Sequence, residues 1–129
     1  MYYRKESNAS YNFVAPNIEK DADKKVEVVF PTSELVEPTL SSNAATVKVE
    51  RSTTIIDLGT LSAAATITLE PGNDLAVGSI VVVKSTSDGT ARAVTVKKGD
   101  DTVASISGVQ SATVVKQLMW TGSTWVLIG

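Results

Sequence analysis

The 129-residue sequence contains no histidine and no cysteine. Their absence excludes a Ser-His-Asp triad, a Cys-His pair, a redox dithiol and a zinc site with nitrogen or sulfur ligands. Aromatic residues make up only 5% of the chain, so any core must consist mainly of aliphatic side chains. The sequence therefore favours a scaffold or binding protein over an enzyme, and no catalytic residue, cofactor or metal is expected.

Strong charge and long apolar runs are missing as well. Twelve basic and 14 acidic residues give a net charge of −2, which leaves no basic excess to neutralise a nucleic-acid backbone. No apolar stretch is long enough to span a bilayer, and no apolar run follows residues 1–6. We therefore expect no nucleic-acid partner, no membrane span and no signal peptide.

The composition changes near residue 26, which predicts a polar N-terminal arm over residues 1–25 and one β-domain over residues 26–129. The arm holds nine of the 26 charged residues but also four of the seven aromatic rings. A segment that only floats in solvent has no use for such rings. We expect the arm to dock, on its own domain or on a neighbouring chain. The candidate anchor residues are Tyr2, Tyr3, Tyr11, Phe13 and Val14.

Short segments of alternating apolar and polar residues follow the arm, separated by turn residues such as those at 71–74. The expected strands are 26–30, 46–50, 53–58, 64–69, 79–84, 92–97, 102–106, 111–120 and 123–128. The expected inward residues are Val47, Val49, Ala65, Ile67, Leu69, Val94 and Val96. In the strand 53–58, Ile56 and Leu58 are expected on one face and Ile55 and Asp57 on the other. The continuous apolar run at 79–84 predicts a strand covered on both faces. Residues 31–43 contain two prolines and are expected to form a loop or an edge segment.

This pattern predicts an all-β fold with no helical periodicity. Because the strands are short and the turns are tight, we expect a single antiparallel β-sandwich or small barrel of about eight or nine short strands, with an extended N-terminal arm. A meander or Greek key would connect the strands. No repeat is strong enough to predict a solenoid.

The chain ends in a Trp-x-Gly-x-x-Trp hairpin at residues 120–125, preceded by the segments Thr-Ile-Thr-Leu (66–69), Gly-Ser-Ile-Val-Val-Val (78–83) and Ala-Val-Thr-Val (93–96). This order resembles the β-domains of tailed-bacteriophage virion proteins, which include head fibres, capsid decoration proteins and the ends of tail fibres. The likeness covers residues 54–129. It implies a virion protein that is made in the host cytoplasm.

Two groups of residues allow a functional and a structural interpretation. Trp120 and Trp125 could form a surface contact for a sugar, although packing within a hairpin is the commoner use of such rings. Four aspartates in expected turns could bind calcium, but turn aspartates more often accept hydrogen bonds from their own backbone. These are Asp74, Asp88, Asp100 and Asp101. No Asp-x-Asp-x-Asp-Gly pattern supports the metal.

The first hypothesis is a non-enzymatic virion structural protein, a capsid decoration or head-fibre subunit attached through its arm. Its expected partners are other capsid or fibre subunits, and it would form a homo-oligomer or be present in many copies per particle. The alternative is a carbohydrate- or receptor-binding β-module such as a tail-fibre domain. A glycan array would separate the two hypotheses.

Overall fold

The computed structural model describes residues 20–21, 23–24 and 33–129. The chain divides into two units, Met1–Phe30 and Pro31–Gly129. In the first unit, β2 (Lys20–Asp21) pairs with β3 (Asp23–Lys24). The strand expected at 26–30 lies outside the described residues. The rest of this section concerns the second unit, which is built of strands; no helix in the described part of the chain is long and apolar enough to cross a membrane.

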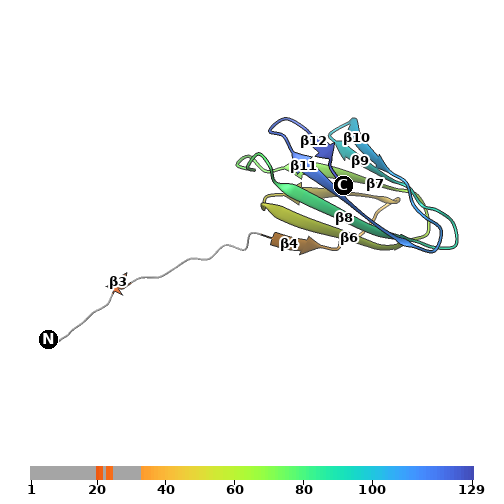
Figure 1. Cartoon of the computed structure of the whole chain (residues 1–129), viewed down its shortest axis with the longest axis horizontal. Helices are drawn as coiled ribbons and strands as arrows, with labels where there is room; N and C mark the ends of the chain where they lie inside the picture. The colour runs from red at the N-terminus through yellow and green to blue at the C-terminus, as the bar shows by residue number, and fades with distance from the viewer. Residues whose placement is uncertain (1–19, 22, 25–32) are drawn as a thin grey trace. The chain divides into compact units, whose positions relative to one another are not determined.

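Nine strands of the second unit form two sheets (Figure 1). The five-stranded sheet has the order β12 (Trp125–Leu127), β11 (Thr113–Trp120), β8 (Ile80–Ser87), β6 (Thr53–Leu61), β4 (Ser33–Val36). The four-stranded sheet has the order β10 (Asp101–Ile106), β9 (Val94–Lys98), β7 (Ala65–Pro71), β5 (Ala44–Val49). The all-β prediction is confirmed.

The connection between the strands differs from the expected one. From β4 to β9 the chain alternates between the two sheets, so residues 33–49, 53–71 and 80–98 each form one coil with a strand in either sheet. As a result the pairs β4–β6, β6–β8, β5–β7 and β7–β9 are all parallel. The prediction of a purely antiparallel fold is wrong, because the turns reverse the chain into the opposite sheet rather than beside the preceding strand.

Every antiparallel strand pair of the unit includes β10 or β11, and an isolated antiparallel bridge joins Ser41 to Ala44. β10 pairs with β9, and β11 pairs with both β8 and β12. The predicted C-terminal hairpin is therefore confirmed. No strand pair joins the two sheets in the described part of the chain, so the expected alternative of a small closed barrel is wrong.

The two sheets contribute to one hydrophobic core, as the period-two pattern of their strands requires. All seven residues that were expected to point inward are buried, and so are Ile56 and Leu58, which share one face of β6. The expectation for residues 79–84 is wrong in one respect. Val81 and Val83 are buried, whereas Ile80 and Val82 are only half-buried because nothing in the described unit covers the outer side of β8.

Thr54 on β6 is fully buried, and its Oγ1 has no hydrogen-bond partner among the described residues. The substitution Thr54→Val keeps the side-chain shape and removes the hydroxyl. We expect it to raise the free energy of unfolding by about 1 kcal/mol, because an unsatisfied buried hydroxyl no longer has to be desolvated. Urea denaturation measures the change, with Thr66→Val on β7 as the half-exposed control. A lower free energy of unfolding for Thr54→Val would contradict the prediction.

Candidate interaction surface

The two groups of predicted site residues have different outcomes. All five arm anchors, Tyr2, Tyr3, Tyr11, Phe13 and Val14, lie outside the described residues. Trp120 and Trp125 are 7% and 2% exposed, and their ring centroids are 5.0 Å apart with an interplanar angle of 50°. A sugar-stacking platform needs an exposed ring face, so this geometry favours the packing interpretation.

The turn aspartates do not converge. Within the described ranges, no three histidine, cysteine, aspartate or glutamate side chains form a group that could hold a metal ion. The carboxylate of Asp88 accepts hydrogen bonds from Arg92 Nε at 2.8 Å and Nη2 at 3.1 Å, and from the Thr90 amide at 3.1 Å. The Arg92 hydrogen bond, followed by the Thr90 amide, holds the pKa of Asp88 below its usual value. Asp88 thus stabilises its own turn.

The outer face of the four-stranded sheet is polar. Cross-strand partners share a face, so the register places Ala44, Thr66, Thr95 and Ser105 in one outward row and Thr46, Thr68, Lys97 and Thr102 in the next. We call this surface the polar face. Its threonines are half-buried or exposed, and its chemistry is that of a solvated surface.

The outer face of the five-stranded sheet is different. One outward row contains Thr53, Ile80, Met119 and Val126, and the next contains Leu35, Ile55, Val82 and Gln117. We call six adjacent apolar residues of these rows the apolar face: Leu35, Ile55, Ile80, Val82, Met119 and Val126. Leu35 is 60% exposed, Val126 42% and Ile55 37%, while the other three are half-buried. A contiguous exposed apolar patch marks an interaction site in a soluble domain.

An ion pair borders the apolar face. In the next outward row, Lys84 Nζ on β8 donates to Asp57 Oδ2 on β6 at 3.5 Å. The other carboxylate oxygen of Asp57 accepts the Gly59 amide at 2.9 Å. Gly59 has a φ of 67° and lies where the β6–β8 register shifts, a conformation that glycine adopts without strain. The bulge thus fixes one negative and one positive charge beside the apolar rows.

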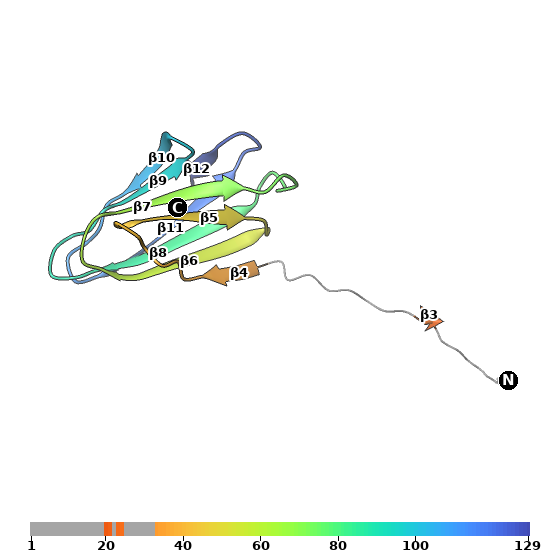
Figure 2. The same cartoon turned by 180° about the vertical axis from the view of Figure 1, so that it is seen from behind.

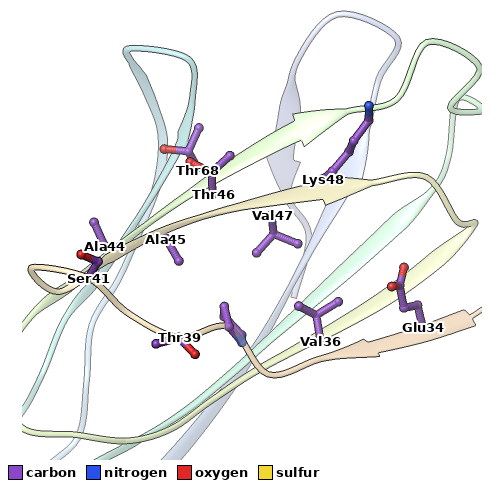
Figure 3. A pocket seen from close by; sticks show the side chains of 11 residues that line it. Glu34, Val36, Thr39, Ser41, Ala44, Ala45, Thr46, Val47, Lys48 and Thr68 are labelled. Carbon is purple, nitrogen blue, oxygen red and sulfur yellow. The ribbon is translucent and has the colours of Figure 1, made fainter.

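A groove of about 680 Å³ lies between β4 and β5, which are edge strands of the two sheets. Figure 3 shows Val36 and Val47 pointing toward one another across it, with Ala45 beside Val47, whereas Thr46 and Lys48 point to the other side of β5. Val36, Ala45 and Val47 thus give the groove an apolar part, and Glu34, Thr39 and Ser41 also line it. The two edge strands that form it, β4 and β5, are labelled in Figure 2.

The edge of β5 also offers backbone hydrogen-bonding groups. The Thr66 amide donates to Asn43 O at 2.9 Å, and the Gly72 amide donates to Val49 O at 2.8 Å. Because backbone groups alternate in direction along a strand, those of Thr46 and Lys48 face away from β7. Among the described residues no strand pairs with them. Such an edge can accept an extended segment.

Comparison of the chain with protein families, with curated proteins and with solved structures finds no match. We therefore infer the function of the chain from the polar face, the apolar face and the groove. Sequence reasoning missed both the apolar face and the groove. The available signal was the run Ile80–Val83, whose outward residues continue the apolar character of the inward ones.

Proposed function

We propose that the chain is a non-enzymatic structural protein of a tailed-phage virion, a capsid decoration or head-fibre subunit. The observation that carries the proposal is the contrast between the polar face and the apolar face. A domain that works alone in water gains nothing by leaving one sheet face apolar, whereas a subunit of an assembly uses such a face to bind its neighbours.

The chemistry of the described residues supports a structural role. The sequence supplies no imidazole and no thiol, and no three acidic side chains of the described residues form a group that could hold a metal ion. The groove between β4 and β5 is lined in part by the apolar Val36, Ala45 and Val47, and Glu34 is the single carboxylate among its lining residues. Contacts between surfaces, rather than a reaction, are what this arrangement can provide.

The proposed mechanism is assembly. The arm over residues 1–25 attaches the subunit to the particle through its aromatic anchors, and the β-domain adds contacts through its free edges and its apolar face. We also assign the domain to the β-sandwich class in its parallel-coil form, since residues of both sheets belong to one core. The proposal places the protein in the virion after synthesis in the host cytoplasm, in many copies per particle.

The test is the location of the chain in cells that produce it. Particles are banded on a density gradient, and the chain is quantified in each fraction with a specific antibody and by mass spectrometry. The proposal predicts that the chain bands with the particles at a fixed copy number. A chain that stays entirely in the free-protein fractions would contradict it.

A further inference from the structure

We propose that the apolar face is a self-association surface, on which the apolar face of a second copy of this chain packs. This inference rests on the proposed function, because it names the partner of one of the assembly surfaces, but it can be tested with the purified protein alone. Three properties of the face favour a second copy as its occupant: its apolar centre, its size and its charge.

The centre of the face has the composition of a covered sheet. Ile80 and Val82 alternate along β8 with the buried Val81 and Val83, which gives the continuous apolar run that is typical of strands covered on both faces. Their outward neighbours in register are Ile55 on β6 and Met119 on β11. The polar face has no such run. The sequence of β8 therefore fits a sheet with a second apolar layer on its outer side.

The size of the face suits an interface between copies. The five strands β4, β6, β8, β11 and β12 contain 4, 9, 8, 8 and 3 residues. At about 3.3 Å per residue and about 4.8 Å between strands, the outer side of this sheet covers roughly 500 Å² in plan. Protruding side chains add to this area, so the accessible surface reaches the lower range of specific protein interfaces, about 600 Å² per partner. The apolar face occupies one end of the outer side of the five-stranded sheet. A threonine pair with a 2.7 Å contact, Thr86 Oγ1 to Thr113 Oγ1, forms the polar rim of this side.

The charge of the face is self-complementary. The outward positions of the five-stranded sheet contain one carboxylate, Asp57, and one ammonium group, Lys84, both in the row that borders the apolar face. A two-fold rotation brings the Asp57 of one copy toward the Lys84 of the other and repeats the contact symmetrically. The same charge balance disfavours an anionic lipid surface, which requires a basic cluster. The outward positions of the described strands also lack the tryptophan and tyrosine that anchor proteins in membrane interfaces.

The test compares lysine substitutions on the two faces. Ile55→Lys introduces a charge in the centre of the apolar face, and Leu35→Lys introduces one on its exposed edge strand. Thr66→Lys makes the matched change in the central strand β7 of the polar face. Sedimentation equilibrium over a range of concentrations measures association, and far-UV circular dichroism verifies folding. We expect the parent and Thr66→Lys to associate with the same dissociation constant, and both apolar-face variants to associate about 30-fold more weakly or not at all.

Two results would overturn the inference. One is a parent protein that remains monomeric at every concentration, and the other is an association that neither Ile55→Lys nor Leu35→Lys weakens. If Ile55→Lys fails to fold, Leu35→Lys decides the outcome, because its side chain is 60% exposed and its replacement leaves the core intact. A monomeric parent that still bands with particles would refute self-association while supporting the proposed function. A parent protein that associates but is absent from particles would support self-association and contradict the proposed function.

Discussion

Removal of residues 120–129 is expected to abolish folding. The truncation deletes β12 and the last residue of β11, and with them both tryptophans of the core. It also removes two backbone hydrogen bonds of 2.8 Å that Trp120 forms, one from its amide to Ser79 O and one from the Gly78 amide to its carbonyl. Loss of a buried tryptophan costs about 3–5 kcal/mol, so the loss of two is comparable to the whole stability of a small domain, about 5–15 kcal/mol.

The measurements are soluble yield and the thermal melt followed by circular dichroism. Ser123→Ala at the exposed tip of the same hairpin is the control, and its melting temperature should match that of the parent. Trp125→Ala gives a graded version of the same effect. A soluble truncated protein that melts at the parental temperature would show that the hairpin does not belong to the core.

Removal of residues 1–18 is expected to leave a folded domain that no longer attaches to particles. Among the described residues, the buried core of the second unit consists of residues from position 47 onward, and the deletion removes none of these. The deletion does remove the five proposed anchors, whose aromatic members lose little conformational entropy on docking. We expect an unchanged melting temperature and no binding to particles that lack the protein.

Co-sedimentation of the full-length and truncated proteins with such particles makes the comparison. A matched control replaces Tyr2, Tyr3, Tyr11 and Phe13 by serine in the full-length chain, which keeps the length of the arm and removes its rings. Equal attachment of all three proteins would show that the β-domain carries the interface. A truncated protein that fails to fold would show that the arm belongs to the core.

The sequence predicted the strands from residue 46 onward and their inward residues because each of these depends on local periodicity. In β6, for example, alternation alone separates the buried Ile56 and Leu58 from the outward Ile55 and Asp57. The partners of the strands could not be predicted in the same way. The turn at 71–74 ends β7, but its residues do not determine whether the chain returns beside β7 or crosses to the other sheet.

The apolar face could not be predicted from the sequence for a related reason. Leu35, Ile55, Val82 and Val126 come from four separate strands, and only the register brings them together. The prediction that residues 79–84 are covered on both faces is wrong for the isolated unit, and the same apolar run becomes an argument for a covering copy. The groove likewise arises from the parallel coil, which a sequence without a regular repeat does not reveal.

If the protein assembles through the apolar face and leaves the polar face in solvent, assembly should protect residues of the first face and not those of the second. Because the chain has no cysteine, single-cysteine variants report on each face without background. The decisive measurement is the rate of maleimide labelling of Ile55→Cys and Thr66→Cys, each in dilute solution and in the assembled state. We predict that assembly slows the labelling of Ile55→Cys several-fold and leaves that of Thr66→Cys unchanged. Labelling of Ile55→Cys at the same rate in both states would contradict the account.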